Sequence, residues 1–343
     1  MSETDPFDEI AKNFATFSPD KFKQKMNQML DSHPNEESKK FWGEYSQLRT
    51  QDGEYETKIR LLDSILGINS NDYLAHFEKG RLLGEAGNHQ EALLCFEKVT
   101  ELKPDRVVGW ANRGYALNLL GKNEESLQYF DKAIELDQND FLAWEYKGMA
   151  LGNLNKYEES IECFDKATEL DTKNILSWFK KGIAYFRLAK PTMTEQDRKN
   201  YEEALKCFEK ATDLINTMEV GAGVISYVVE HKPFLATIKI FSHKGLTFLI
   251  LMQPDKALEC FEKVLALDPE DPALWYYKSQ ALQELDREKE SGECFDKALE
   301  LGFVPGKDFV YKENPKDLTK EEEKSFQDNE EKKDDAEFKK DTQ

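Results

Sequence analysis

The 343-residue sequence has no long apolar stretch. Its longest apolar run, residues 246–252, is interrupted by Thr247 and is far shorter than the roughly 20 residues that a membrane-spanning helix needs. The first ten residues, MSETDPFDEI, carry acidic side chains where a secretory signal has basic side chains followed by an apolar core. We therefore expect a cytoplasmic protein with no membrane partner.

Basic residues are also in short supply. Lys and Arg together number 47, against 67 Asp and Glu, so the formal net charge is −20. Nucleic-acid backbones and anionic membrane surfaces attract Lys and Arg rather than carboxylates, so this balance argues against both as partners. The acidic surplus is compatible with a basic protein partner. By itself, such a surplus also keeps an elongated protein soluble.

Catalytic and cofactor-binding motifs are missing as well. The five histidines have no Cys, Ser or carboxylate nearby in a recognisable catalytic motif, and no glycine-rich phosphate loop occurs. Adjacent glutamates, such as Glu124-Glu125 and Glu158-Glu159, recur near the starts of predicted helices, where acids suit the helix dipole. We expect no enzyme activity, no catalytic residues and no cofactor.

The sequence does contain a repeat. Within residues 107–174 one pattern of Trp, Gly, Leu, Phe and Ala occurs twice, the second copy 34 residues after the first. The first copy consists of Trp110, Gly114, Leu117, Phe130 and Ala133, and the second of Trp144, Gly148, Leu151, Phe164 and Ala167. This period and pattern resemble the tetratricopeptide repeat (TPR) family, whose unit is a pair of helices. The resemblance implies an all-α fold, a right-handed superhelical solenoid of stacked helix–turn–helix units.

Steps of 34 residues divide much of the chain into about seven repeats. They are 39–72, 73–106, 107–140, 141–174, 175–218, 238–271 and 272–305. The fifth has about ten extra residues between its helices, where Thr192 and Glu195 have capping-box spacing and predict an early start of the second helix. We expect residues 1–38 to form an N-terminal helical cap, residues 219–237 an inserted segment, and residues 306–343 a charged tail that is disordered or forms a lone solvated helix.

We number positions within a repeat as slots, slot 1 being the first residue. Slots 4, 8 and 11 of the first helix (helix A) and slots 20, 24 and 27 of the second (helix B) each form one stripe at about 100° per residue, so the two stripes should face each other. Glycine at slot 8 should allow close helix approach. We expect the first helix of a repeat to end at a residue in the left-handed conformation, at Gly87, Gly121 and Asn155. We expect N-caps of the next helix A at Asp72, Asp140, Asn174 and Asp271.

The five cysteines share slot 23, and each precedes a phenylalanine. Stacked helices hold equivalent slots about 10 Å apart or more, beyond the 7 Å or so that a disulfide tolerates between Cα atoms. No C-x-x-C pair occurs, so a zinc site is not supported. We expect structural thiols at the edge of the core and no metal site at Cys95, Cys163, Cys207, Cys260 and Cys294.

The resemblance implies that helix A lines a concave binding face. Relative to slot 4, slots 2, 5, 9 and 12 lie about 80–160° round the helix, so their side chains should miss the packing seam. Aromatic, apolar and cationic side chains at these slots and their border predict a protein-binding groove. Its residues are Phe77, Arg81, Asn112, Tyr115, Tyr146, Met149, Phe179, Lys180, Ile183 and Arg187. The alternative is that some of them pack against the next helix A.

One TPR sub-class binds the C-terminal carboxylate of chaperones through a two-carboxylate clamp. Phe77 and Arg81 stand where that clamp requires Lys and Asn, and Leu142 and Tyr146 replace its basic pair. Within a consecutive trio of repeats only Asn112 fits, so a co-chaperone is disfavoured.

The leading hypothesis is a scaffold or adaptor that grips a peptide or helix of a protein partner in the groove. The alternative is a structural self-assembler, a homo-oligomer built through the insertion and the terminal helices. The insertion contains VGAGVISYVVEHKPF, an apolar stretch that must pack on something, either on its own repeats or on a partner.

Overall fold

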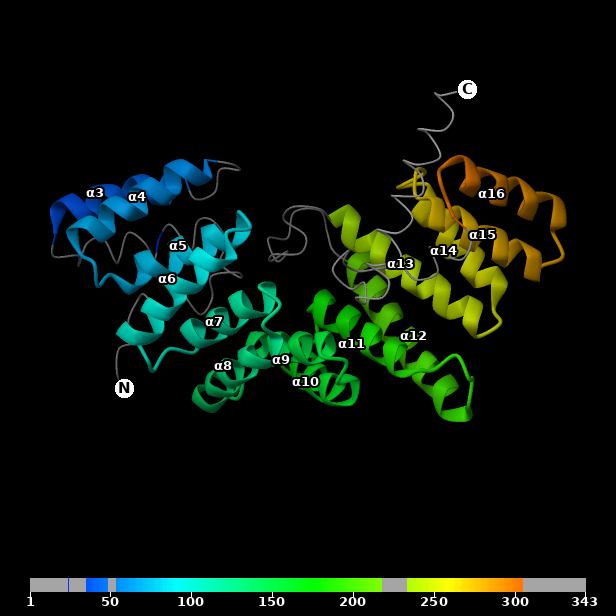
Figure 1. Ribbon diagram of the computed structural model, residues 1–343, viewed down its shortest axis with the longest axis horizontal. Coiled ribbons are helices and arrows are strands. Elements are labelled where there is room, and N and C mark those ends of the chain that lie inside the picture. Colours follow the sequence, from blue (N-terminus) through cyan, green and yellow to red (C-terminus); the bar gives the residue numbers. More distant parts are fainter. Residues whose placement is uncertain (1–23, 25–34, 49–53, 218–232, 305–343) are drawn as a thin grey trace, which may run out of the picture. The chain divides into compact units, whose positions relative to one another are not determined.

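The computed structural model describes residues 24, 35–48, 54–217 and 233–304. Within these ranges all regular secondary structure is helical, and the helices follow one another in pairs (Figure 1). The prediction of an all-α stack of helix pairs is confirmed. The helices predicted before residue 35, most of the inserted segment and the C-terminal tail lie outside the described residues.

Each pair consists of a helix A and a helix B. The helices A are α3 (Glu36–Leu48), α5 (Tyr73–Glu85), α7 (Val107–Leu119), α9 (Phe141–Asn153), α11 (Ile175–Leu188), α13 (Pro233–Ile250) and α15 (Pro272–Glu284). The helices B are α4 (Tyr55–Ile68), α6 (His89–Leu102), α8 (Asn123–Leu136), α10 (Tyr157–Leu170), α12 (Glu195–Thr217), α14 (Pro254–Leu265) and α16 (Glu288–Glu300).

The chain divides into two compact units, residues 1–269 and 270–343. The described part of the first unit contains α3–α14, and that of the second contains α15 and α16. Within the first unit each helix packs on the next along the chain, and α7, α9, α11 and α13 also pack on one another in sequence. Successive helices A therefore share one face of this unit, which we call the helix-A face.

Local signals place the ends of the helices. The predicted N-caps are confirmed, because side-chain oxygens of Asp72, Asp140, Asn174 and Asp271 accept backbone hydrogen bonds in the first turns of α5, α9, α11 and α15. The predicted stops are confirmed too, since Gly87, Gly121 and Asn155 have φ of 82°, 76° and 59°. In this left-handed region glycine carries no steric penalty and asparagine a small one.

The slot-8 glycines lie against the slot-24 phenylalanine of the same repeat. A Cβ atom on Gly114 would lie 2.6 Å from a ring carbon of Phe130, and one on Gly182 would lie 2.5 Å from a ring carbon of Phe208. Both phenylalanines are fully buried. The predicted close approach of helix A and helix B is confirmed, and the ring of helix B occupies the space that a side chain at slot 8 would need.

Two recurring polar contacts join successive repeats. The indole N–H at slot 4 donates to a carbonyl six residues earlier, as from Trp144 Nε1 to Gln138 O at 3.0 Å. A cation at slot 7 pairs with an acid at slot 25 of the preceding repeat, as Lys147 does with Asp131 at 2.7 Å. The same ion pair recurs as Lys79–Asp63, Arg113–Glu97 and Lys181–Asp165.

The fifth pair has an irregular connection that differs in detail from the prediction. Helix α12 begins early, at Glu195, but its capping box uses Thr194 and Asp197: Thr194 Oγ1 accepts from Asp197 N at 3.2 Å, and Asp197 accepts from Thr194 N at 2.9 Å. Thr192 instead donates its hydroxyl to Asp197 at 2.9 Å. The predicted Thr192–Glu195 box is wrong because Glu195 is itself the first helical residue. Hydrogen bonds, first from the Thr194 hydroxyl, hold the pKa of Asp197 well below its ordinary value.

Two other boundaries also shift. Helix α13 begins at Pro233, so residues 233–237, predicted as part of the insertion, are helical. Proline is favoured in the first turn, where its missing N–H has no helical partner to lose. Helix α3 begins at Glu36, inside the segment predicted as the N-terminal cap.

Candidate functional site

The cysteine thiols are buried and carry no sign of reactivity. All five are free and lie in the interior. Burial, only partly offset by nearby lysines, raises the pKa of Cys95, Cys163 and Cys260 to about 11 and that of Cys207 to about 12. A thiol with such a pKa is almost wholly protonated near neutral pH and is a poor nucleophile. Their structural role at slot 23 agrees with the prediction.

Metal and membrane sites have no support in the described part of the chain. No cluster of three or more His, Cys, Asp or Glu side chains is placed there to hold a metal ion. No helix in the same ranges is both long and apolar enough to cross a membrane.

Three of the predicted groove residues are buried, not open to a ligand. Phe77, Phe179 and Ile183 are 4%, 5% and 8% exposed. The ring of Phe77 packs 6.1 Å from that of Phe96, and the ring of Phe179 packs 5.9 Å from that of Phe208. Their predicted exposure is wrong because helix A packs on its own helix B, and α11 packs on α13 as well, which buries a wider arc than the slot 4–8–11 stripe.

Arg81 is half-buried and is held in place by carboxylates. Its guanidinium pairs with Glu78 at 3.2 Å and also with Glu85. The Tyr45 hydroxyl donates to the same Glu78, which is buried. Burial works against the charged guanidinium, yet the neighbouring carboxylates outweigh it and raise the pKa of Arg81. This cluster joins α3 to α5, so Arg81 has a structural role that the sequence pattern did not reveal.

Three other predicted groove residues have different surroundings: Met149, Lys180 and Arg187. Met149 is half-buried against the cluster of Ile161, Phe164 and Ala184. Lys180 is half-buried, with Nζ 5.9 Å from the ring centre of Phe179. Arg187 is exposed in the last turn of α11. The cavity lined by Asn112 and Tyr146 does not include any of these three residues.

Asn112, Tyr115 and Tyr146 come together between α7 and α9. The rings of Tyr115 and Tyr146 stack with centres 4.4 Å apart and planes inclined by 21°. Tyr146 also packs at 6.2 Å on the buried ring of Phe130. The Asn112 amide donates to the carbonyl of Val108, one turn earlier, at 2.8 Å. All three side chains are half-buried, so they offer surface and are also held in place.

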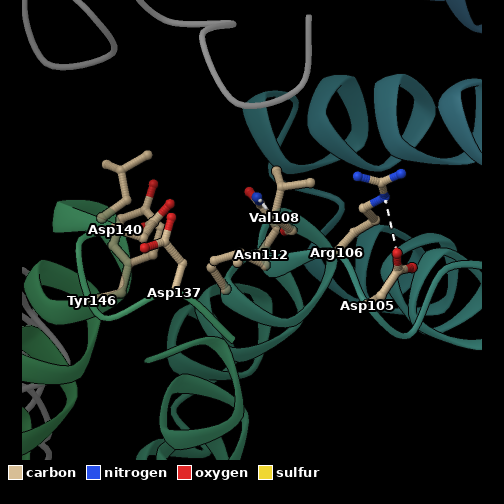
Figure 2. A pocket seen from close by; sticks show the side chains of 10 residues that line it. Asp105, Arg106, Val108, Asn112, Asp137, Asp140 and Tyr146 are labelled. Carbon is tan, nitrogen blue, oxygen red and sulfur yellow. Dashed lines mark hydrogen bonds and ion pairs between the residues drawn. The ribbon is translucent and has the colours of Figure 1, made fainter. Parts of the chain in front are cut away.

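A cavity of about 160 Å³ opens beside these residues (Figure 2). We call it the α7–α9 pocket. It is lined by Asp105, Arg106, Val107, Val108, Ala111, Asn112, Asp137, Asp140, Leu142 and Tyr146. Only Asn112 and Tyr146 were predicted as groove residues. The others lie in the connections before α7 and α9 or in the first two turns of these helices. Slot 2, occupied by Val108 and Leu142, and slot 5, occupied by Ala111, were the available signals.

The residues that line the pocket include more acidic than basic side chains. Three carboxylates and one guanidinium line it, and the guanidinium of Arg106 pairs with the adjacent Asp105 at 3.6 Å. In Figure 2 Asp137, Asp140 and Tyr146 form one group, while the Arg106 side chain turns toward Asp105. Asp137 accepts from the amide of Asn139 at 2.9 Å, and Asp140 caps α9. The surrounding walls are the apolar side chains of α7 and α9.

A buried carboxyl lies one helix turn from this pocket. Glu145 in α9 is 2% exposed and accepts a hydrogen bond from the hydroxyl of Ser177 in α11. Burial raises the pKa of Glu145 to about 7, against the opposing effect of the Ser177 hydrogen bond and of Lys180. This contact joins two successive helices A, and its strength depends on the protonation state of one group.

Solved structures with the same arrangement of helices are known. PilW, a type IV pilus biogenesis factor, has a TM-score of 0.55 at 15% identity, with 68% of this chain and 95% of that chain covered. A tetratricopeptide repeat protein from Parabacteroides merdae ATCC 43184 has a TM-score of 0.51 at 15% identity, with 79% and 95% covered. MamA from Desulfovibrio magneticus RS-1 has a TM-score of 0.46 at 20% identity, with 55% and 99% covered. The first two likenesses show a shared fold. No curated protein matches the chain.

Family models match the repeats directly. Models described as tetratricopeptide repeat match residues 107–140 and 238–271, residues 73–106 and 272–301, and residues 129–162; a model described as TPR repeat matches residues 148–188. These matches together cover residues 73–188 and 238–301, which contain the slot-8 glycines Gly114 and Gly182 and the slot-24 Phe130. The chain belongs to the tetratricopeptide repeat family.

Proposed function

We propose that this protein is a non-enzymatic scaffold that binds a peptide or helix of a protein partner on its helix-A face, with the α7–α9 pocket as an anchor site. TPR proteins are generally protein-binding scaffolds. Stacked tyrosines beside a small cavity supply the rigid aromatic surface that is enriched where proteins bind one another.

The size of the pocket carries this proposal. Sites for drug-sized molecules usually enclose about 300–1,000 Å³, whereas the α7–α9 pocket encloses about 160 Å³. A cavity of about 150 Å³ holds a molecule the size of benzene. The pocket therefore suits one side chain of a longer chain better than a whole small-molecule substrate, which favours a binding scaffold over an enzyme.

A peptide selection tests the proposal. Random peptides displayed on phage are selected against the intact protein, and the dissociation constants of the recovered peptides are measured for Tyr146→Ala. We expect weakening by about tenfold or more, as for a buried aromatic anchor. Val108→Phe, which fills part of the pocket without removing the tyrosine stack, should weaken binding in the same direction.

Tyr157→Ala is the matched control. Tyr157 is a half-buried tyrosine at the start of helix B, and its hydroxyl donates to Asn155 rather than facing the pocket. Its removal should leave the peptide affinity unchanged. Equal affinities for the wild type, Tyr146→Ala and Val108→Phe, with unchanged circular dichroism, would exclude this pocket as the anchor site.

A further inference from the structure

We propose that the outer face of α16 is a docking surface for a short segment of the same chain, residues 306–311, which binds through its aromatic side chains. This surface is separate from the α7–α9 pocket and does not depend on the proposed function. Three features support it: α16 exposes positions that earlier helices B bury, the chain is anchored where it leaves α16, and the residues that follow continue the aromatic spacing of the repeats.

Slot 28 shows the difference between α16 and the earlier helices B. In α6, α10 and α12 this slot holds Thr100, Thr168 and Thr212, which are 4%, 4% and 3% exposed. Each of these three helices packs on the helix A that follows it. In α16 the same slot holds Leu299, which is 42% exposed, and no helix follows α16 in the residues that the structure describes.

The neighbouring slots of α16 change in the same way. The slot-24 phenylalanines of α6, α8, α10 and α12 are buried, whereas Phe295 is half-buried. The small slot-20 residues of the helices from α6 to α14 are buried, whereas Ser291 is half-buried. Because these slots are spaced four residues apart on a helix, they lie on one face. We call Ser291, Phe295 and Leu299 the α16 stripe. Covering its apolar side chains would be favourable, and an array ordinarily ends in a polar outer face.

The chain is anchored where it leaves α16. Gly302 has a φ of 94°, and the Phe303 amide donates to the carbonyl of Ala298 at 2.9 Å, which is the hydrogen bond of a Schellman turn. Phe303 is buried and stacks on the ring of Tyr276 in α15 with centres 4.3 Å apart. The residues that follow therefore start from a fixed point at the end of the α16 stripe.

This anchor places residues 306–311 within reach. A chain extends by up to about 3.3 Å per residue, so Phe309 can lie as far as about 20 Å from Phe303. The stripe from Leu299 to Ser291 is about 12 Å long at 1.5 Å per residue. A segment tethered so closely has a high effective concentration at the stripe, which favours it over an occupant from another molecule.

The aromatic spacing of the repeats continues into this segment. An aromatic residue at slot 4 follows the slot-24 phenylalanine of the preceding repeat by 14 residues at Trp110, Trp144, Trp178 and Trp275. Phe309 follows Phe295 by the same 14 residues, and Val310 and Tyr311 add apolar surface next to it. The rest of the tail is dominated by charge, so these residues are the natural cover for the stripe.

The same sequence argues against a complete eighth repeat. Glu313 stands at slot 8, where closely packed repeats have glycine, and Pro315 stands at slot 10, where it would interrupt a helix. The occupant is therefore a short segment with Phe309 and Tyr311 as its anchors, and not another helix pair.

Thiol protection tests the proposal in the full chain. Leu299→Cys places a thiol on the α16 stripe, and Leu94→Cys places one on α6 at a position that is 57% exposed. The rate of each with a maleimide in the native protein is divided by its rate in denaturant, which removes differences in local reactivity. We expect the normalised rate at position 299 to be about tenfold or more below that at position 94, because reaction at 299 requires the segment to open.

Substitutions in the segment identify the occupant. Phe309→Ser combined with Tyr311→Ser, in the Leu299→Cys chain, should raise the rate at position 299 to within about threefold of that at position 94. The matched control is Phe326→Ser combined with Phe338→Ser, which removes two aromatic rings from the later, charged part of the tail. This control should leave the protection unchanged.

Two outcomes would overturn the proposal. Equal normalised rates at positions 299 and 94 would show that the α16 stripe is open to solvent. Protection that survives the substitutions of Phe309 and Tyr311 would assign the stripe to another occupant, and protection that then grows with protein concentration would identify that occupant as a second copy of the chain.

Discussion

Glycine at slot 8 shows how one residue controls the distance between two helices. Glycine in the middle of a helix costs roughly 1 kcal/mol relative to alanine, so it survives there only where a side chain would cost more. In this protein the reason is the ring at slot 24, which fills the space above the glycine. The consequence for stability depends on what surrounds each glycine rather than on glycine itself.

The first prediction concerns Gly182→Ala. The added Cβ would lie 2.5 Å from a ring carbon of Phe208, and that ring is fully buried, so the helices must separate. Overpacking of this kind costs about 1–3 kcal/mol, more than the roughly 1 kcal/mol gained in helix propensity. We expect a net loss of about 1–2 kcal/mol in the free energy of unfolding, measured by urea denaturation.

Gly43→Ala is the control for this prediction. Gly43 lies inside α3, and apart from its two chain neighbours and the nearby backbone of its own helix, no heavy atom lies within 4 Å of the place that an alanine Cβ would take. Alanine should therefore stabilise the protein by about 0.5–1 kcal/mol. Destabilisation by both substitutions, or stabilisation by both, would refute the assignment of close packing to slot 8.

The second prediction concerns the thiols. All five thiols are free and buried. Burial raises the pKa of four of them, Cys95, Cys163, Cys207 and Cys260, to about 11 or 12. Ellman's reagent should therefore react slowly with the native protein. All five should react at once in denaturant. Leu94→Cys is the positive control, since Leu94 is 57% exposed beside buried Cys95, and it should add one fast-reacting thiol. Rapid reaction of the native wild type would contradict the burial of slot 23.

Successive helices A are coupled through side chains that pair across the repeat boundary. Tyr115 and Tyr146 stack between α7 and α9, and Glu145 and Ser177 form a buried hydrogen bond between α9 and α11. The tyrosine stack combines partial burial with ring contact. The Glu145 contact involves a titratable group in a site that disfavours its charged form, so it makes the packing of α9 on α11 depend on pH.

The third prediction concerns this pH dependence. The pKa of Glu145 is about 7 in the folded protein, above the value of about 4.3 expected in the unfolded chain. Between these two values the folded state holds more protons than the unfolded state, so the contribution of Glu145 to stability falls as pH rises and levels off above about pH 7. The full change is about 4 kcal/mol.

Glu145→Gln removes this dependence. Its amide oxygen still accepts from Ser177, and it cannot ionise. The difference in the free energy of unfolding between the variant and the wild type should therefore shift in favour of the variant from pH 5 to pH 8, by about 1–3 kcal/mol. The measurement is urea denaturation at each pH. A difference that does not change with pH would mean that Glu145 ionises normally in the folded protein.

At the scale of the whole chain, which has a net charge of −20, we expect the stability to be distributed over neighbouring repeats. In a repeat array each unit contacts its neighbours, so loss of a terminal pair removes one interface and leaves the others. The division into compact units at residues 269 and 270 places every residue of the α7–α9 pocket in the first unit.

The fourth prediction concerns a chain shortened to residues 1–269. We expect it to keep the helical circular dichroism of the remaining pairs and a cooperative unfolding transition, with a midpoint equal to or somewhat below that of the full chain. Peptides selected on the full chain should bind it with unchanged affinity. Loss of helical signal beyond that of the removed helices would show that the second unit is needed for the first to fold.

Light scattering addresses the homo-oligomer that the sequence left open as an alternative. A monomeric mass at high protein concentration would count against self-assembly. A stable larger species would require the helix-A face to be reconsidered as a contact between copies.

Features that depend on near neighbours in the chain were predictable from the sequence alone. The caps Asp72, Asp140, Asn174 and Asp271 and the left-handed residues Gly87, Gly121 and Asn155 belong to this class because each acts within a few residues of its own position. The pairing of slots 8 and 24 belongs to it because the two helices of a unit are joined by a short turn and the pattern recurs every 34 residues.

Whether a helix-A side chain is exposed to a ligand, in contrast, depends on tertiary packing around helix A. Phe77 and Phe179 are buried on the slot-24 ring of their own helix B, and Phe179 also contacts His243 of the next helix A. Arg81 is held by Glu78, which also accepts from Tyr45 of the preceding helix A. Contacts of a helix A with its own helix B and with the helices A beside it cover an arc that the period of one helix does not reveal. The α7–α9 pocket forms for the same reason. Its walls come from two repeats and the connections before them, so its shape and its charge arise only when the two repeats are packed together.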